Sequence, residues 1–181
     1  PEIAGTSTSG YLGCTDSDGD SWADALDEYP MDGTQWVDSD SDGYGDNQTG
    51  TNPDSCPSVE GYSEFDRMGC PDADEDGYSD PSGDWGTEDG ADAFPARDSQ
   101  WADSDTDGFG DNPSPAYLSD DCPSVSGTST QDLLGCRDSD GDGWSDEGDV
   151  FEDDPSQWMD SDEDGYGDNP SPASMPDYCP N

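Results

Sequence analysis

The chain has 181 residues, of which 48 are acidic and three are basic, so its formal net charge is −45. Only 27% of its residues are hydrophobic, and burial of apolar surface cannot offset the self-repulsion of a compact fold with this charge. The charge excludes binding to a nucleic-acid backbone and disfavours docking onto anionic lipid, and no apolar run is long enough to span a bilayer. We therefore expect multivalent cations to order the chain.

Three segments, 1–56, 57–122 and 123–181, share one internal order and predict three tandem repeats. Each starts at a proline, crosses a Gly/Ser/Thr-rich stretch to a Gly-Cys step, and continues through two acidic loops to a closing cysteine. The second repeat has an insertion within 81–91 that contains Trp85, which we interpret as a surface insertion rather than a binding loop. The end of the third segment reads as the start of a next repeat. We therefore expect a slice of a longer array, or a subunit that continues into its neighbour.

The first acidic loop of each repeat has carboxylates at the spacing of an EF-hand-type calcium loop, positions 1, 3, 5, 9 and 12, with Asp92 returning to position 12 of the second repeat after its insertion. Alternate side chains then point inward as the backbone curls around the ion, and the carbonyl oxygen of position 7 faces the metal. Position 6 is glycine in the second and third repeats and Ser21 in the first. The predicted ligands are Asp16, Asp18, Asp20, Trp22, Asp24 and Asp27; Asp72, Asp74, Asp76, Tyr78, Asp80 and Asp92; and Asp138, Asp140, Asp142, Trp144, Asp146 and Asp149.

The second loops start with the same spacing, but their position 12 falls on Thr49, Ser114 and Ser171, none of which is a bidentate ligand. Their predicted ligands are Asp38, Asp40, Asp42, Tyr44 and Asp46; Asp103, Asp105, Asp107, Phe109 and Asp111; and Asp160, Asp162, Asp164, Tyr166 and Asp168. The missing oxygens must come from elsewhere. Candidate donors are the carboxylates of the neighbouring first loop, or Asp54, Asp120 or Asp121, and Asp177, which precede the closing cysteines.

Six loops in one phase favour Ca²⁺ sites over a merely solvated acidic surface. Oxygen ligands without histidine select calcium over transition metals. One divalent ion in each of six loops would still leave a net charge of −33 out of the original −45. We therefore expect six or more Ca²⁺ ions, some of them shared between loops.

The six cysteines predict structural disulfides and an extracellular location, because no CxxC pair and no histidine is present. Two pairings are open. One closes each repeat on itself as Cys14–Cys56, Cys70–Cys122 and Cys136–Cys179. The other, Cys56–Cys70 and Cys122–Cys136, spans the junctions and leaves Cys14 and Cys179 to bond an adjacent repeat or subunit. We favour the second because a loop of about 15 residues closes with less entropy loss than one of about 43 or more.

Regular secondary structure is not expected beyond a short helical turn after each first loop. Prolines follow two of the second loops directly, and glycine, serine and aspartate dominate elsewhere. Aromatic residues recur at position 7 and in the links between loops, as in Tyr29, Trp36, Phe94, Trp101, Phe151 and Trp158. We interpret them as small apolar plugs between the loops, with sugar stacking as the alternative.

The unit DxDGDGWSDxxDxF…SQWxDSDxDGYGDN resembles the thrombospondin type 3 repeat. Tyr29-Pro30 and Phe94-Pro95 stand where that family has Cys-Pro, and Phe151-Glu152 departs further. The family has a glutamine before the second loop. In this chain the corresponding glutamines, Gln35, Gln100 and Gln157, occur one residue earlier. The resemblance covers the acidic loops and not the junctions. It implies a calcium-wrapped, tandem-repeat rod that is mostly irregular, extracellular and structural, of a microbial surface or fibre type.

Enzyme chemistry has little support, because the chain has no histidine and no lysine and its dense carboxylates are better explained as ligands. We expect a calcium-stiffened building block of a surface stalk or fibre that associates end to end or continues a longer array. The alternative is a calcium-dependent adhesion module that binds a protein or a glycan. Glycans are expected at Asn47, the only N-glycosylation sequon, or on the Ser/Thr stretches 6–9 and 128–130.

Overall fold

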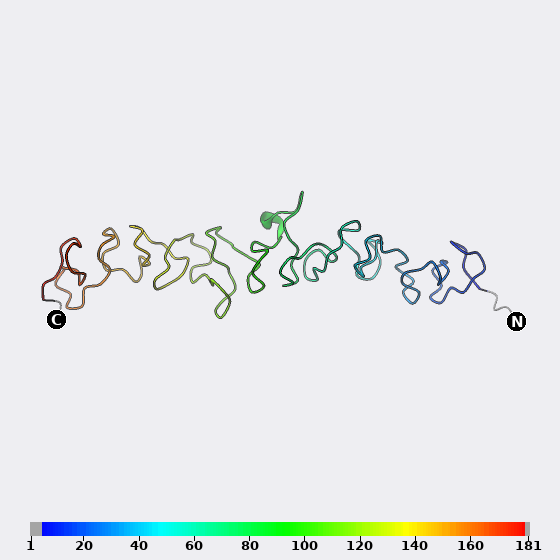
Figure 1. Ribbon diagram of the computed structural model, residues 1–181, viewed down its shortest axis with the longest axis horizontal. Helices are drawn as coiled ribbons and strands as arrows, with labels where there is room; N and C mark the ends of the chain where they lie inside the picture. Colours follow the sequence, from blue (N-terminus) through cyan, green and yellow to red (C-terminus); the bar gives the residue numbers. More distant parts are fainter. Residues whose placement is uncertain (1–4, 180–181) are drawn as a thin grey trace. The chain divides into compact units, whose positions relative to one another are not determined.

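The computed structural model describes residues 5–179, and this part of the chain is almost entirely irregular (Figure 1). Its one helix is the 3-10 helix η1, Thr87–Asp89, which ends at Gly90 in the left-handed conformation. Within residues 5–179, extended segments pair only through isolated β-bridges and form no sheet. No helix in the described range is long and apolar enough to cross a membrane. The mostly irregular fold predicted from the sequence is confirmed.

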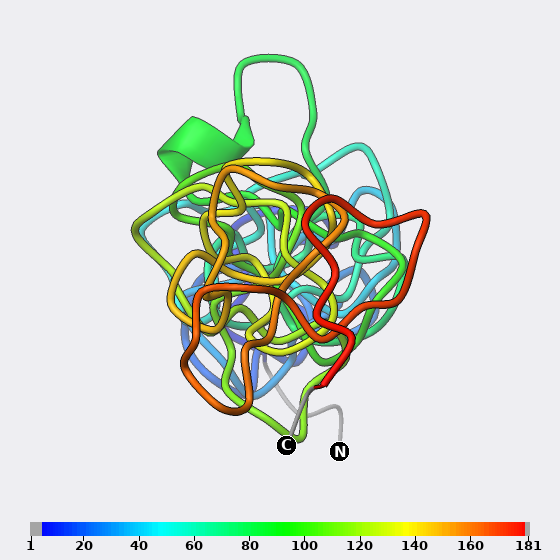
Figure 2. The same cartoon turned by 90° about the vertical axis from the view of Figure 1, so that its left-hand side faces the viewer.

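The expected helical turns are only partly formed. After the first loops of repeats one and three the chain makes single hydrogen-bonded turns, Leu26 N to Ala23 O at 2.8 Å and Asp149 N to Ser145 O at 2.9 Å. In the second repeat η1 lies inside the insertion. Figures 1 and 2 show this segment projecting from the surrounding chain. Trp85 is not free within it, because Arg67 lies over its ring at 5.4 Å and its backbone pairs with Ser82.

The chain divides into two compact units, unit 1 (Pro1–Asp98) and unit 2 (Ser99–Asn181). This division falls between the two loops of the predicted second repeat. The predicted repeat boundaries at 56/57 and 122/123 each lie within a unit, where a disulfide ties the two sides together. Unit 1 therefore contains both loops of the first repeat and the first loop of the second repeat, and unit 2 contains the remaining three loops.

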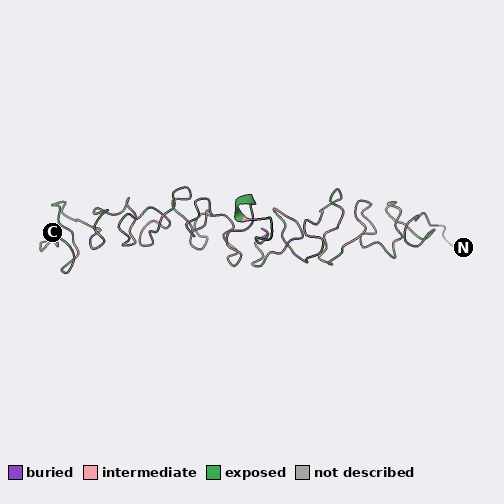
Figure 3. Cartoon of the chain, turned by 90° about the horizontal axis from the view of Figure 1, so that it is seen from above, coloured by how far each residue is buried: buried purple, intermediate pink, exposed green. Residues whose placement is uncertain are grey.

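The interior is polar. Within residues 5–179 the buried hydrophobic residues are Ala23, Cys70, Ala91 and Cys136. The largest fully buried side chains are instead three glutamines, Gln35, Gln100 and Gln157, with exposed fractions of 1%, 0% and 1%. Figure 3 shows that the buried stretches are short and separated by half-buried and exposed chain. A polar interior is stable only if its groups find hydrogen-bond partners.

Each glutamine finds those partners in the backbone of a second loop. In unit 1 the Nε2 group of Gln35 donates to the carbonyl oxygens of Asn47 at 3.1 Å and Thr51 at 3.0 Å, and its Oε1 accepts from Asn47 N at 2.9 Å. The Asn47 side chain donates back to Thr34 O at 2.8 Å. We call this arrangement the glutamine clamp. Gly45 allows it, since a Cβ atom there would lie 2.2 Å from Gln35 Oε1.

Unit 2 contains the same clamp twice. Gln100 donates to Asn112 O at 3.1 Å and Tyr117 O at 3.2 Å and accepts from Asn112 N at 2.9 Å. Gln157 makes the corresponding bonds to Asn169 and Ser174. All amide groups of the buried side chains are therefore satisfied, and the cost of burying them is offset. These are the glutamines to which the family resemblance drew attention.

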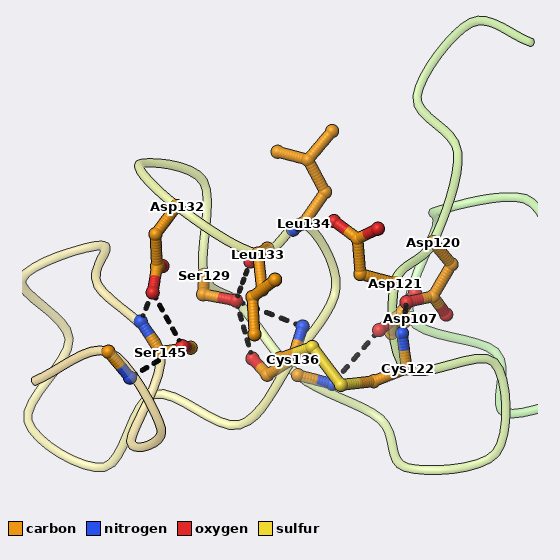
Figure 4. The surroundings of a disulfide bond; sticks show 12 residues. Asp107, Asp120, Asp121, Cys122, Ser129, Asp132, Leu133, Leu134, Cys136 and Ser145 are labelled. Atoms are coloured by element: carbon orange, nitrogen blue, oxygen red, sulfur yellow. Dashed lines mark hydrogen bonds between the residues drawn. A yellow bond between two sulfur atoms is a disulfide. The ribbon is translucent and has the colours of Figure 1, made fainter. Parts of the chain in front are cut away.

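The disulfides follow the favoured pairing, Cys56–Cys70 and Cys122–Cys136, while Cys14 and Cys179 are unpaired and exposed. The alternative of three bridges within repeats is wrong. A buried serine holds the second cysteine of each junction: Ser129 Oγ accepts from Cys136 N at 2.9 Å and donates to Leu133 O (Figure 4). Ser63 makes the same contacts around Cys70.

Replacing Gln100 by leucine, which has a similar size, is expected to destabilise unit 2 by about 3 kcal/mol, because three backbone groups lose a hydrogen bond to a fully buried side chain. Chemical unfolding in calcium-containing buffer measures this. Gln131→Leu is the matched control, since Gln131 is exposed. Equal stability of the two variants would show that the clamp does not hold the fold.

Candidate metal centres

Each acidic loop is curled by its own first aspartate. In the third repeat Asp138 Oδ1 accepts from Gly141 N at 2.7 Å and Oδ2 accepts from Gly143 N at 3.0 Å. Gly143 has a φ of 101°, which glycine adopts without strain. Ser21 holds the same place in the first repeat with a φ of 91°. Equivalent bonds start the other loops, at Asp16, Asp38, Asp72, Asp103 and Asp160.

The curl brings alternate carboxylates together. One oxygen from each of Asp138, Asp140 and Asp142 lies within 4.8 Å of the others. A Ca²⁺–oxygen distance of about 2.4 Å places two ligands on opposite sides of one ion about 4.8 Å apart, so a single ion can reach all three. The same holds for Asp16, Asp18 and Asp20; Asp38, Asp40 and Asp42; Asp72, Asp74 and Asp76; and Asp103, Asp105 and Asp107.

The carboxylates at position 9 have a second role that the sequence interpretation missed. Asp46 Oδ1 accepts from Ser39 N at 3.1 Å and Oδ2 from Ser39 Oγ at 2.6 Å. The pairs Ser17–Asp24, Ser104–Asp111, Ser139–Asp146 and Ser161–Asp168 are bonded in the same way. The recurring serine at position 2 was the available signal. These aspartates close the loop, and their part as ligands stays a prediction.

Aspartates that precede the closing cysteines are enclosed beside the second loops. Asp54 and Asp120 are 0% and 5% exposed. In each, Oδ1 accepts the N–H of the closing cysteine, Cys56 at 2.6 Å and Cys122 at 2.7 Å, while Oδ2 is buried with no hydrogen-bond partner. Asp177 has the same bond to Cys179 and the same unpartnered oxygen.

The structure also distinguishes between the two candidates that precede Cys122. Asp120 is buried and adds to the negative potential of Asp105, Asp107 and Asp111. Figure 4 shows it beside Asp107. Asp121 is exposed, and its Oδ2 accepts from Leu134 N at 2.9 Å. Asp120 is therefore the residue that faces the loop.

The aspartates at position 12 of the first loops are held in the same way. Asp27, Asp92 and Asp149 are 7%, 1% and 7% exposed. Their Oδ1 atoms accept the N–H two residues on, from Tyr29 at 2.7 Å, Phe94 at 2.7 Å and Phe151 at 2.6 Å. Despite the insertion, Asp92 returns beside Asp74, Asp76 and Asp80. The insertion thus leaves the centre of the second repeat intact.

Many oxygens of these clusters have no protein donor. Buried oxygens without a hydrogen-bond partner occur on Asp18, Asp20, Asp40, Asp76, Asp105, Asp140 and Asp142, in addition to Asp54, Asp92, Asp120 and Asp177. Both oxygens of Asp40 and of Asp105 are affected. An unsatisfied buried carboxylate oxygen is costly, and convergent ones need a shared partner. A hard cation that takes only oxygen ligands satisfies all of them, so the residues present fit such an ion.

Aromatic side chains lie beside the centres. The rings of Trp144 and Trp158 stack with centroids 5.9 Å apart, joining a first loop to the link that leads to the second. Tyr29 Oη donates to Asp38 Oδ2 at 3.3 Å in the corresponding link of the first repeat. These contacts agree with the interpretation of the link aromatics as plugs between loops.

Burial raises the pKa of the most enclosed carboxyls, and neighbouring carboxylates raise it further. The pKa rises from 3.8 to about 6 for Asp54, to about 6 for Asp76 and to about 7 for Asp92. The pKa of Asp162 is raised as well, by desolvation and by Asp164 and Asp177. An ion that binds these groups must displace their protons.

No protein-family model matches this chain, and a search of curated proteins finds no match either.

Asp120→Asn is expected to weaken Ca²⁺ binding by the second loop of unit 2 by about tenfold or more, because it removes a buried anionic ligand. Asp121→Asn is the matched control, with the same change of charge one residue away, and should leave the affinity within about twofold. Calcium titration calorimetry measures both. Equal effects of the two substitutions would contradict the assignment of Asp120.

Cation binding should become weaker as the pH falls through the range 7 to 6. Raised pKa values mean that the cation-free fold binds protons more tightly than the unfolded chain does, so its stability falls as pH rises. The cation needs the ionised form, and its affinity changes with pH in the opposite direction. Calorimetry in buffers of different ionisation enthalpy should show more protons released per Ca²⁺ at pH 6 than at pH 8. Asp92→Asn should abolish the part of the proton release that titrates near pH 7. Equal numbers of protons released per Ca²⁺ at pH 6 and pH 8 would refute the prediction.

Proposed function

We propose that this chain is an extracellular calcium-binding structural repeat protein, a building block of a surface stalk or fibre that Ca²⁺ stiffens. The observation that carries the proposal is the set of buried, unpartnered carboxylate oxygens on aspartates of five of the six loops and on Asp54, Asp92, Asp120 and Asp177. Oxygen-only ligand sets of this size suit Ca²⁺, with affinities of about 10⁻⁴ to 10⁻³ M as in extracellular modules. We propose six or more ions, some shared between loops.

Stiffening follows from where the ligands lie in the chain. Asp42 accepts the Gly61 N–H at 3.2 Å, and Asp107 accepts the Gly127 N–H at 2.9 Å. An ion at these loops would therefore hold the loop, the closing cysteine and the segment beyond the disulfide together. This supports our proposal of a thrombospondin type 3-like repeat protein, in which the aspartates act as ligands rather than as catalytic groups.

Extracellular location and end-to-end association are parts of this proposal. The two disulfides indicate an oxidising compartment. Cys14 is equivalent in sequence position to Cys70 and Cys136. Its N–H donates to Ser7 Oγ at 2.9 Å, as the N–H groups of Cys70 and Cys136 donate to Ser63 Oγ and Ser129 Oγ. Cys179 holds the place of Cys56 and Cys122. Each unpaired thiol thus belongs to half of a junction, which an adjacent repeat or another copy would complete.

Glycans remain proposals and can be placed more narrowly. In the stretches 6–9 and 128–130, Ser7 and Ser129 are buried with their hydroxyls bonded, so Thr6, Thr8, Thr128 and Thr130 are the exposed candidates. A glycan on Asn47 would leave from Nδ2, the atom that bonds Thr34 O in the glutamine clamp.

Chelation is expected to unfold the chain, because the carboxylates would then repel one another without compensation. The circular dichroism spectrum should change and the hydrodynamic radius should grow in EDTA, and both should recover in Ca²⁺. A spectrum and radius that EDTA does not alter would refute the calcium proposal.

The same samples distinguish the fibre from the alternative, a calcium-dependent adhesion module. Oxidised glutathione and Ca²⁺ should yield end-to-end disulfide-linked oligomers that non-reducing electrophoresis and electron microscopy detect, and Cys14→Ser should stop at dimers. Capture of a protein or glycan partner without self-association would favour the adhesion module instead.

A further inference from the structure

A pocket of about 420 Å³ opens in unit 1 over the first loop of the second repeat. Two aromatic rings and two glutamates, Tyr62, Phe65, Glu64 and Glu75, line it together with the loop carboxylates Asp72 and Asp76. Tyr62 and Phe65 are 56% and 67% exposed. The Phe65 ring covers Gly77, where a Cβ atom would lie 2.5 Å from it, and is 5.6 Å from the ring of Tyr78. The pocket therefore combines exposed aromatic rings with negative charge.

The fold itself does not require these side chains, and the other repeats show why. The backbone N–H groups of Glu64 and Phe65 both donate to Gly77 O at 2.9 Å. The same turn forms in the first repeat from Thr8 and Ser9 to Ser21 O, and in the third from Thr130 and Gln131 to Gly143 O.

At the pocket positions the other repeats have small or neutral residues. Tyr62 corresponds to Thr6 and Thr128, Glu64 to Thr8 and Thr130, Phe65 to Ser9 and Gln131, and Glu75 to Gly19 and Gly141. Three identical turns therefore form with and without the aromatic and acidic side chains. Because two large rings left in solvent add little to stability, their presence here points to a ligand.

We propose that this pocket binds the ammonium group of a lysine side chain presented by a partner protein. A cation is attracted to the faces of both rings and to carboxylates beside them. Calcium at Asp72 and Asp76 would neutralise the loop, and Glu64 and Glu75 would still carry charge for the ligand. The 181 residues contain no lysine, so a second copy of them cannot supply this ligand. This inference rests on the proposed function in one respect, that Ca²⁺ binds Asp72 and Asp76.

The pocket, and not the insertion, is the recognition site that this proposal assigns to unit 1. The ring of Trp85 already contacts Arg67 at 5.4 Å, so the insertion uses its large apolar side chain within the chain. Pocket binding and calcium stiffening would then combine in one protein, with the second repeat as the specialised one.

The test uses the full chain in saturating Ca²⁺ at fixed ionic strength. The probes are the capped peptide Gly-Lys-Gly and the same peptide with its lysine Nε acetylated, observed by ligand NMR. The lysine peptide should bind saturably and the acetylated one should not. The double variant Tyr62→Thr, Phe65→Ser copies the first repeat without changing the net charge, and it should weaken binding by about three- to fivefold.

Leu12→Ser is the control variant, since Leu12 is 75% exposed and lies outside the pocket, and it should bind as the unaltered chain does. Equal affinity for the acetylated peptide would overturn the proposal, as would undiminished binding by the double variant, which would mean diffuse attraction to an acidic surface. Stronger binding of a methyl glucoside than of the lysine peptide would assign the rings to sugars instead. Calcium affinity is measured in parallel, and its loss in the unaltered chain would count against the proposed function and not against the lysine pocket.

Discussion

Repulsion between carboxylates is the constraint on which the rest of this structure depends. A net charge of −45 is concentrated in loops where three aspartates place oxygens within 4.8 Å of one another. Several of these oxygens are buried and have no protein donor. Such an arrangement is unfavourable by itself and becomes favourable when a multivalent cation takes the place of both the missing counter-charge and the missing donor.

The aspartates serve the backbone and the proposed ion at once. At position 5, at position 12 and before the closing cysteines, one oxygen accepts the N–H two residues on, as in Asp142 with Trp144 at 2.9 Å and Asp120 with Cys122 at 2.7 Å. This bond fixes the direction of the side chain. It leaves the second oxygen of Asp142 and Asp120 buried without a hydrogen-bond partner, whereas at Asp42 and Asp107 the second oxygen accepts from Gly61 and Gly127. A ligand set can therefore be preorganised in a chain that has almost no helix or strand.

Buried polar side chains take the role that apolar ones have in most domains. The glutamine clamps hold the second loops from inside, and the junction serines hold the disulfides. Because hydrogen bonds are directional, these contacts specify one backbone path where a small apolar core would not. The junctions are reinforced twice, by a disulfide and by the bonds of Asp42 and Asp107 to Gly61 and Gly127.

The sequence by itself determined those features that arise from residues close together along the chain. The grouping of Asp138, Asp140 and Asp142 follows from alternate side chains on one curled segment, and the irregular fold follows from proline, glycine and aspartate content. The pairing of Cys56 with Cys70 could be favoured because the loop between them is short.

Only the tertiary structure decided which residues from separate segments of the chain come into contact. It selected Asp120 over its neighbour Asp121, and it returned Asp92 to its loop across the insertion. It also gave Gln35 its partners at Asn47 and Thr51. These contacts join residues far apart along an irregular chain, where no helical or strand period relates one position to another, so their geometry is set by packing and hydrogen bonds alone.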